Sequence, residues 1–297
     1  MPLDILVPFW GDPQLLQDAI RSVQAQTSTD WVVTVVDDAY PDASVAEFFA
    51  SLGDPRVRYV RNETNLGITD NYRRCLELAE HDLLVFLGCD DLLLPDFVEV
   101  VLAAHAAHPD AAVIQPGVQV IDENGLVVRT LVDVVKQRVT MPRGQGRRRV
   151  GGEALAASLL RADWMYWPSL VFRREVVERI GFRDGLPLIQ DLAIVVDIIT
   201  EGGSMVIEPT VCFSYRRHSA SASSATLLDG KRFRGEREYF RRAAAQMDAR
   251  GWSKAARAAR LHLTSRLHAV TLVPRAVLSR DTDGARQLLG HAFARAA

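Results

Sequence analysis

A short apolar strand followed by two adjacent carboxylates is the feature that most constrains this chain. Residues 83–87 form a continuous Leu, Val and Phe run that is too short for a typical helix, so it predicts a strand buried on both faces of a parallel sheet. Asp90 and Asp91 follow where this strand ends. Open α/β sheets bind ligands at this end of their strands, and adjacent acids repel unless a cation neutralises them. The pattern therefore favours a divalent cation that carries a phosphorylated ligand, although a loop acid beside a helix cap explains an isolated pair as well.

The first 110 residues alternate between strands and helices. Strands are predicted at residues 3–7, 31–36, 57–61 and 83–87, and helices at 14–26, 44–52, 69–79 and 97–108. This order predicts an α/β fold with a parallel sheet and right-handed crossovers, which is a nucleotide-binding architecture. The chain has neither a Gly-x-Gly-x-x-Gly motif nor a Walker lysine loop, so a dinucleotide enzyme and a P-loop NTPase are disfavoured.

Composition sets the outer limits of the prediction. With 297 residues, 48% hydrophobic and 24% charged, the chain can bury one large core, with or without a smaller appendage. The three cysteines, Cys75, Cys89 and Cys212, are spaced for neither a disulfide framework nor a zinc site, which favours a reducing compartment. The sequence begins without a basic, apolar leader and contains no apolar run of membrane-spanning length. We therefore expect a cytoplasmic protein.

Several short motifs, in this order along the chain, resemble those of the inverting family 2 glycosyltransferases of the GT-A fold. They lie at residues 7–11, 19–23, 35–38, 65–67, 87–91, 168–174, 190–191 and 215–219. The resemblance runs from residue 3 to about residue 224. It implies a Rossmann-like, mostly parallel sheet flanked by helices in a domain of residues 1–230, with a donor-binding half at about 1–110 and an acceptor-binding half at about 111–230.

The expected donor is a nucleoside-diphosphate sugar, UDP- or dTDP-linked. Trp10 follows the first strand and can stack on a base, while the Asp38 carboxylate can accept hydrogen bonds from a base N–H or a ribose hydroxyl. A packed core tryptophan and a loop aspartate are the simpler alternatives. The resemblance implies further nucleotide-sugar contacts at Pro8, Asn65, Gly67, Asn71 and Asp90.

The same resemblance implies a divalent cation, Mn²⁺ or Mg²⁺, bound by Asp91 with Asp90 nearby. It also implies that His218 completes the metal or diphosphate site, although a lone histidine is more often a surface or packing residue. The other histidines form no ligand cluster in the sequence.

Asp191 is the expected catalytic residue. It begins an apolar helix predicted over residues 192–200, so the helix dipole should hold its carboxylate ionised, and a helix N-cap is the simpler interpretation. In the resembling family the acid here is the general base that deprotonates the acceptor hydroxyl. Gln190 stands where that family often has Glu. The nearby rings of Trp164, Tyr166 and Trp167 predict either a core ridge or part of an acceptor pocket.

The middle of the chain is predicted to contain strands at residues 112–121 and 205–215. Residues 122–125 have the composition of a hairpin turn leading into residues 126–135. Residues 136–149 hold six basic residues and no acid, so they predict a solvated mobile loop, a phosphate-binding lid, or both.

Residues 231–297 predict a basic helical region, with 15 Lys or Arg against five Asp or Glu. Helices are expected at 231–249, at 254–273 with Pro274 at its end, and after residue 281. Such a surface suits the protein's own domain, a homodimer partner or anionic lipid, and we favour the first two over peripheral membrane contact. No motif supports nucleic-acid binding.

The sequence thus predicts a metal-dependent inverting glycosyltransferase. The acceptor would be a hydroxyl of a glycan, a lipid-linked molecule or a small molecule. A sugar-nucleotide pyrophosphorylase is one alternative, but the chain lacks the glycine-rich, basic N-terminal loop of that class. A non-catalytic nucleotide-sugar-binding module is another, and it would be expected to have lost the base at Asp191. Both alternatives remain open.

Overall fold

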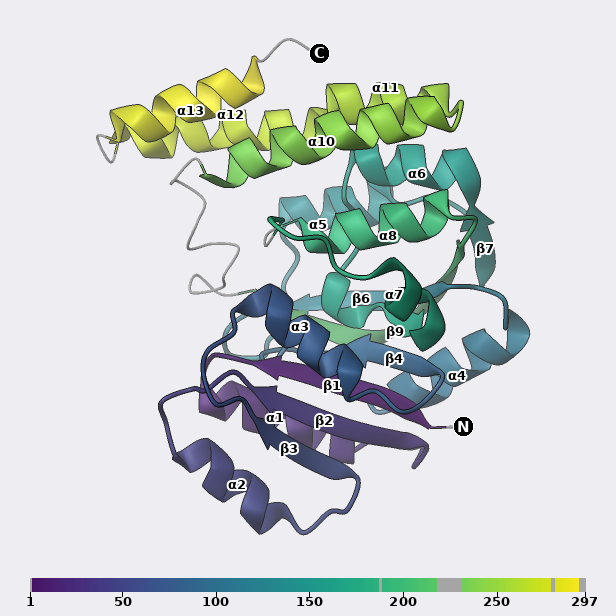
Figure 1. Ribbon diagram of the computed structural model, residues 1–297, viewed down its shortest axis with the longest axis vertical. Helices are drawn as coiled ribbons and strands as arrows, with labels where there is room; N and C mark the ends of the chain where they lie inside the picture. Colours follow the sequence, from purple (N-terminus) through teal and green to yellow (C-terminus); the bar gives the residue numbers. More distant parts are fainter. Residues whose placement is uncertain (1, 187–188, 218–230, 279–280, 294–297) are drawn as a thin grey trace.

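The computed structural model describes residues 2–186, 189–217, 231–278 and 281–293. In this part of the chain, nine strands form one sheet in the order β3-β2-β1-β4-β8-β6-β9-β5, with β7 pairing with β9 (Figure 1). The first four are β1 (Leu3–Phe9), β2 (Trp31–Asp37), β3 (Val57–Arg61) and β4 (Leu83–Phe86). These four are mutually parallel. The expected α/β fold is confirmed.

Helices cover both faces of this parallel part. They are α1 (Pro13–Gln24), α2 (Ser44–Leu52), α3 (Ile68–Glu77) and α4 (Phe97–Ala107). In β4, Leu84 and Phe86 belong to one apolar cluster while Leu83 and Val85 belong to another on the opposite face. Because successive strand residues point to opposite faces, β4 is buried on both sides, as its unbroken apolar run predicts.

The second half of the chain completes the sheet and adds helices above it. Its strands are β5 (Leu92–Leu93), β6 (Val113–Ile121), β7 (Arg148–Gly151), β8 (Val171–Arg173) and β9 (Ser204–Arg216). Its helices are α5 (Leu131–Val135), the π-helix η1 (Lys136–Thr140), α6 (Gly152–Arg161), the 3₁₀ turn η2 (Trp167–Ser169), α7 (Arg174–Ile180) and α8 (Gln190–Thr200). The apolar faces of α3, α6 and α8 share one cluster, so they cover the same face of the sheet.

The turn expected at residues 122–125 is present, but the hairpin strand expected over residues 126–135 is not: the prediction of that strand is wrong. The Asp122 carboxylate accepts hydrogen bonds from the N–H groups of Asn124 and Leu126, but a single antiparallel bridge, Ile121 to Val127, follows. The chain then enters α5, where the Thr130 hydroxyl accepts the Asp133 N–H at 3.2 Å as a helix cap does. Tertiary contacts of Asp133, described below, hold this helix in place.

The basic segment 136–149 is bonded to the domain at both ends, while residues 143–146 between them are exposed, as the loop alternative predicts. Lys136 Nζ donates to the Met165 carbonyl at 3.2 Å, and Arg147 Nη1 donates to the Ala103 carbonyl at 2.8 Å. Arg149 Nε donates to Ser204 Oγ at 2.7 Å, alongside the pairing of β7 with β9. These bonds use much of its donor capacity within the fold.

The C-terminal region forms α10 (Lys231–Ala249), α11 (Ser253–Leu261), α12 (Leu263–Leu278) and α13 (Thr282–Ala292). The helix expected over 254–273 is interrupted at His262, whose φ is 27°, and Pro274 lies inside α12 instead of ending a helix. Within the described residues, no helix combines the length and apolar character needed to cross a membrane.

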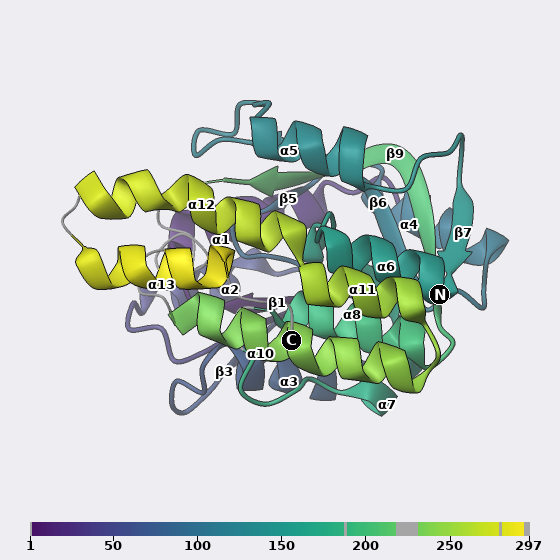
Figure 2. The same ribbon diagram turned by 90° about the horizontal axis from the view of Figure 1, so that it is seen from above.

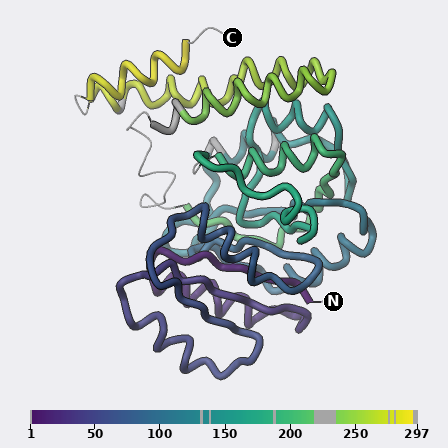
Figure 3. Tube along the Cα trace, in the orientation of Figure 1, coloured from purple at the N-terminus to yellow at the C-terminus, as the bar shows by residue number. Residues whose placement is uncertain are grey.

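Helices α10 and α11 lie on the α/β part of the molecule. Tyr239, Phe240 and Met247 of α10 belong to the same buried cluster as residues of α6 and α8. Figure 2 shows α10 and α11 above α8 and α6, and Figure 3 follows the chain into this top layer. Gln246 Nε2 also donates to Asp197 Oδ1 of α8 at 3.0 Å. The helices after residue 230 thus close a core that α6 and α8 leave open.

We expect Met247→Ala to destabilise the protein by about 2–4 kcal/mol, because it opens a cavity between α10 and the helices beneath it. Arg242→Ala on the same helix is the matched control, since the exposed Arg242 forms only surface ion pairs with Glu238 and should cost under about 0.5 kcal/mol. Urea unfolding measures both values. Equal stabilities would contradict the packing of α10 on the domain.

Candidate active site

The carboxyl ends of the parallel strands meet at one edge of the sheet. Pro8 lies near the end of β1, Asp38 follows β2, Asn62 follows β3, and Asp90 follows β4. Because β1 pairs directly with β2 and β4, these polar groups lie at neighbouring strand ends. This is where open α/β sheets bind their ligands.

Asp38 organises the loop that precedes α3. Its carboxylate is buried and accepts the backbone N–H groups of Leu66 at 2.8 Å and Gly67 at 2.9 Å. Gly67, with φ of 82°, has the left-handed backbone that suits glycine at the point where α3 begins. Both carboxylate oxygens of Asp38 therefore accept hydrogen bonds from the protein backbone, and these bonds fix the shape of this loop.

Asn62 and Asn71 extend the same network. The Asn62 amide nitrogen donates to Asp38 Oδ1 at 2.9 Å and to Asn71 Oδ1 at 3.0 Å. The buried Asn71 in turn donates to the Val36 carbonyl at 3.1 Å. The sequence predicted no role for Asn62, although Asn62 directly follows β3 just as Asp38 directly follows β2. Asn65 lies exposed in the loop that these residues hold.

Trp10 stands at the surface of this edge. Its side chain is 53% exposed, so the alternative of a packed core tryptophan is wrong. The indole meets the ring of Tyr40 edge-on, with centroids 5.4 Å apart. Held from one side and open on the other, the ring is free to stack on a planar ligand.

Asp91 is a buried carboxylate with one oxygen to spare. The residue is 1% exposed, and Oδ1 accepts the Arg216 backbone N–H at 2.8 Å. Oδ2 is buried without a hydrogen-bond partner among the described residues. Burial raises the pKa of Asp91 well above its usual value, and the charge of Asp90 raises it further. A Cβ on Gly88 would overlap Oδ2, so this glycine leaves the space in front of that oxygen open.

The side chain of Arg216 fastens this acidic turn to the neighbouring loop. Its Nε donates to the Asp90 carbonyl at 2.7 Å, and its Nη1 donates to the carbonyls of Asp122 and Glu123 at 3.1 and 3.0 Å. The residues of the 215–219 motif were singled out in the sequence, but this positioning role of Arg216 was not foreseen. It depends on the pairing of β9 with β5, the short strand that directly follows Asp91, which only the fold reveals.

The acidic pair fits a divalent cation. Among the residues that the structure describes, no three His, Cys, Asp or Glu side chains form a ready metal cluster. Mg²⁺ sites commonly use one or two carboxylates and take their remaining ligands from substrate phosphates and water. The orphaned, buried Oδ2 of Asp91 beside Asp90 matches that donor set. His218 lies outside the described residues.

Asp191 lies in the first turn of α8 rather than capping it. The helix begins at Gln190 with Ile189 at the cap position, and Asp191 Oδ1 accepts the Leu192 N–H at 2.7 Å. Gln190, where the resembling family often has Glu, is buried and accepts the Arg183 N–H at 3.2 Å. Gln190 thus holds the chain that leads into α8.

Tyr215 directly precedes Arg216 at the end of β9. Burial raises the pKa of Tyr215, and the charges of Asp91, Asp90 and Asp191 raise it further. Asp191 of α8 and the acidic pair after β4 thus both influence the pKa of this side chain.

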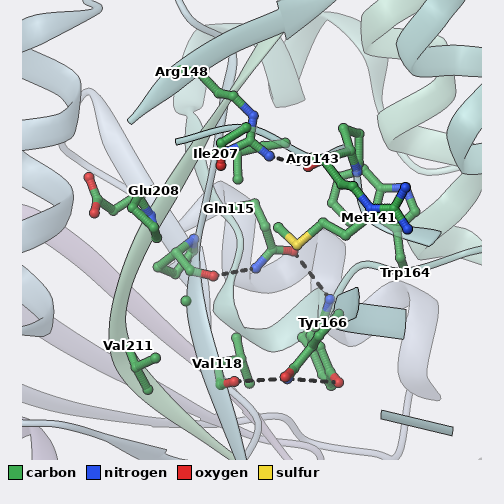
Figure 4. A pocket seen from close by; sticks show the side chains of 16 residues that line it. Gln115, Val118, Met141, Arg143, Arg148, Trp164, Tyr166, Ile207, Glu208 and Val211 are labelled. Atoms are coloured by element: carbon green, nitrogen blue, oxygen red, sulfur yellow. Dashed lines mark hydrogen bonds between the residues drawn. The ribbon is translucent and has the colours of Figure 1, made fainter. Parts of the chain in front are cut away.

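A cavity of about 450 Å³ lies between β6, β9 and the segment after η1. Figure 4 shows Gln115 within it, with Tyr166 on one side and Arg143 and Arg148 on another. The Tyr166 ring lines this cavity and lies 5.3 Å from the ring of Tyr215.

The three aromatic residues near this cavity have different surroundings. Trp164 lines the cavity but is otherwise buried, with Nε1 donating to Ser158 Oγ at 3.1 Å. The Tyr166 hydroxyl donates to Asp133 at 2.9 Å, and Asp133 also accepts two hydrogen bonds from Arg217. Trp167 packs in the aromatic cluster around Phe86, with Nε1 donating to the Tyr72 hydroxyl at 3.0 Å. Both interpretations of this aromatic segment thus have support: Trp167 is core, and Tyr166 lines a pocket.

Comparison with solved structures confirms the GT-A architecture. The chain superposes on the Staphylococcus aureus TarS fragment 1–349 in complex with UDP-GlcNAc with a TM-score of 0.64, covering 99% of this chain and 93% of that one. Sequence identity is 14%, so this likeness concerns the fold.

Curated relatives match shorter segments. The Rhizobium meliloti succinoglycan biosynthesis protein ExoO is 26% identical over 228 residues, 75% of this chain and 63% of that protein. The putative colanic acid biosynthesis glycosyl transferase WcaA of Escherichia coli is 29% identical over 102 residues, 34% of this chain and 37% of that protein. The chain spans between 14% and 63% of the curated relatives it matches.

The family assignment rests on the part of the chain that builds the site. A match to the family model described as glycosyl transferase family 2 covers residues 4–181. This span contains the first four strands, the Asp38 loop and the Asp90–Asp91 turn. The chain belongs to glycosyl transferase family 2.

Proposed function

We propose that this protein is a metal-dependent inverting glycosyltransferase that transfers a sugar from a nucleoside-diphosphate sugar to an acceptor hydroxyl. The observation that carries the proposal is Oδ2 of Asp91, which is buried beside Asp90 and has no hydrogen-bond partner among the described residues. A cation site and a candidate base are the two groups that such a transfer needs.

The donor would lie across the edge formed by β1, β2 and β4. Trp10 is available to stack on the base, and Pro8 lies near the end of β1. Asp38 and Asn71 act through the loop that carries Asn65 and Gly67, which is positioned to meet the ribose and the diphosphate. TarS, which shares the fold, was crystallised with UDP-GlcNAc and with UDP. This supports uridine nucleotides as the first donors to test, with dTDP-sugars next.

Asp91 and Asp90 would hold a divalent cation, Mn²⁺ or Mg²⁺, together with the donor diphosphate. When bound, the cation supplies Lewis-acid chemistry by offsetting the negative charge of the leaving group. Arg216 keeps the two acids in register through its contacts to Asp90 and Asp91. His218 remains a candidate for the same site.

Asp191 would act as the general base. Its carboxylate takes the proton from the acceptor hydroxyl while that oxygen forms a bond to the anomeric carbon. The bond from that carbon to the diphosphate oxygen breaks on the opposite face, so the nucleoside diphosphate leaves with the bonding electrons and the anomeric configuration inverts. A single displacement needs no second, nucleophilic carboxylate beside the sugar.

The acceptor would approach from the side of the cavity. Tyr166 lines the cavity next to Tyr215, and Trp164 also lines it. Aromatic rings suit the apolar C–H faces of sugars. Trp167 would contribute to the site indirectly, through its hydrogen bond to Tyr72 and its packing on Phe86 of β4. The acceptor would be a hydroxyl of a glycan, a lipid-linked molecule or a small molecule, and the biosynthesis of colanic acid and succinoglycan by WcaA and ExoO favours polysaccharide building blocks.

A pyrophosphorylase and a non-catalytic binding module are the alternative functions. Family membership favours glycosyl transfer over a pyrophosphorylase reaction. A non-catalytic binding module would keep the donor site and have no use for Asp191, so that residue distinguishes the two.

Asp38→Asn is expected to loosen the loop before α3, because the amide can accept from only one of the two backbone N–H groups of Leu66 and Gly67. Hydrogen exchange at these two amides should accelerate by about tenfold or more, and donor affinity should fall with it. Asp70→Asn, on the exposed first turn of α3, is the control. A loss of donor affinity with unchanged exchange would instead mean that Asp38 touches the donor itself.

Asp91→Asn should abolish transfer and the cation dependence of nucleotide binding, because a neutral amide replaces a charged ligand. The same substitution should increase stability even though it abolishes activity. Since the folded pKa of Asp91 is raised, the ionised carboxylate destabilises the cation-free fold at neutral pH, and the amide should raise the Tm.

Calorimetry with UDP and Mn²⁺ measures the binding, and a thermal scan measures the Tm. Asp82→Asn, at the other end of β4, is the control and should change neither quantity. Unaltered cation-dependent binding in Asp91→Asn would remove Asp91 from the site.

Asp191→Asn should retain donor and cation affinity while turnover with acceptor falls by about two to four orders of magnitude. The variant should fold, because the Asn oxygen can still accept the Leu192 N–H in the first turn of α8. Turnover and donor affinity are measured on the same preparation. Near-normal turnover would show that Asp191 is not the base and would favour the binding-module alternative.

A further inference from the structure

Helix α12 directs its large apolar side chains to solvent. The exposed residues are Leu263, Leu267, Val270, Val277 and Leu278, among which Leu267 is 63% and Leu278 84% exposed. Their spacing places them along one side of the helix. Ala269 and Ala276, in contrast, are fully buried in the small cluster shared with α13. A helix in water normally does the reverse, burying its large apolar residues and exposing polar ones.

This exposed side carries no charge in the described side chains. The other exposed positions of α12 are Thr264, His268, Thr271 and Pro274. The helix is 16 residues long, or about 24 Å at 1.5 Å per residue. A contiguous apolar strip of this kind on a folded domain usually marks an interaction site.

The surrounding chain is strongly basic. Between Asp248 and Asp281 there are seven Lys or Arg and no Asp or Glu. Lys254 and Arg257 are exposed on α11, which leads into α12. Two of the seven, Arg250 and Arg260, form ion pairs with Glu201 and Asp248. The stretch still carries an excess of positive charge, and its charge complement is an anionic surface.

The strip also lies apart from the packed core. Figures 1 and 2 show α10 and α11 over α6 and α8, while α12 and α13 form a hairpin that extends beyond those helices. The two parts are joined where the Ser265 hydroxyl of α12 lies 2.8 Å from His291 Nε2 of α13, next to Glu236 of α10. The hairpin is thus fixed to the domain and projects its apolar strip outward.

We propose that the α12 strip docks on the surface of an anionic lipid bilayer, with the helix lying in the interface. Interfacial helices combine a buried apolar face with Lys and Arg that attract anionic headgroups. A second copy of the chain is less suited, because a two-fold contact would bring two acid-free, basic stretches together. The sequence favoured packing of this region on the protein's own domain or on a partner subunit over membrane contact. Helices α10 and α11 do pack on the domain, but α12 leaves this face uncovered by the described residues.

Co-sedimentation of the full chain with vesicles tests the proposal. Vesicles of phosphatidylcholine with about a quarter phosphatidylglycerol should bind the protein, vesicles of phosphatidylcholine alone should bind it much more weakly, and added salt should reduce binding. Leu267→Glu combined with Val277→Glu should weaken binding by at least about tenfold, because two apolar contacts are replaced by charges that the anionic surface repels. Leu126→Glu, an equally exposed apolar residue in the turn after β6, is the matched control and should bind normally.

Each other outcome overturns the proposal. Absence of binding by the unmodified chain would do so, as would undiminished binding by the double variant. If sedimentation velocity shows that the unmodified chain is a dimer and that the double variant is a monomer, a second copy occupies the strip instead. Thermal stabilisation by UDP, measured on every variant, checks that the fold and the donor site are intact, so a failure here is separate from any failure of the proposed activity.

Discussion

The site depends on a charge that the fold buries and leaves incompletely satisfied. Asp91 lies under the end of β4 with one oxygen bonded to the Arg216 backbone and the other unpartnered among the described residues. Such a group is costly in a folded protein unless a cation or a proton neutralises it. The rest of the site is arranged around that need, because Arg216 fixes the turn from one side and Gly88 keeps the opposite side open.

Rigidity at the nucleotide edge has a similar origin in buried polar groups. Asp38 and Asn71 are buried and use their hydrogen bonds on the backbone and on Asn62. They therefore set the shape of the loop before α3 instead of presenting free polar atoms. Preorganised loops of this kind lower the entropic cost of binding a flexible diphosphate. Trp10, by contrast, is exposed and available for direct contact.

The C-terminal helices divide into two parts with different surfaces. In α10 and α11 the apolar residues face α6 and α8 and complete the main core. In α12, Ala269 and Ala276 are buried in the cluster shared with α13 and Leu272 and Val273 pack partly against it, while Leu263, Leu267, Val270, Val277 and Leu278 are exposed to solvent. The two pairs of helices thus present different surfaces in one chain, and none of the described helices is long and apolar enough to cross a membrane.

The sequence by itself determined the parallel β-strands, the crossover helices and the acidic pair after β4, because apolar periodicity and strand-end carboxylates are local signals. It also located Asp38 and Asp191 in the chain. Only the tertiary structure decided that Asp38 bonds the loop backbone, that Arg216 meets Asp91 across 125 residues of sequence, and that residues 131–135 are helical. Such contacts join distant segments, and local propensity carries no information about which distant partner will satisfy a buried polar group.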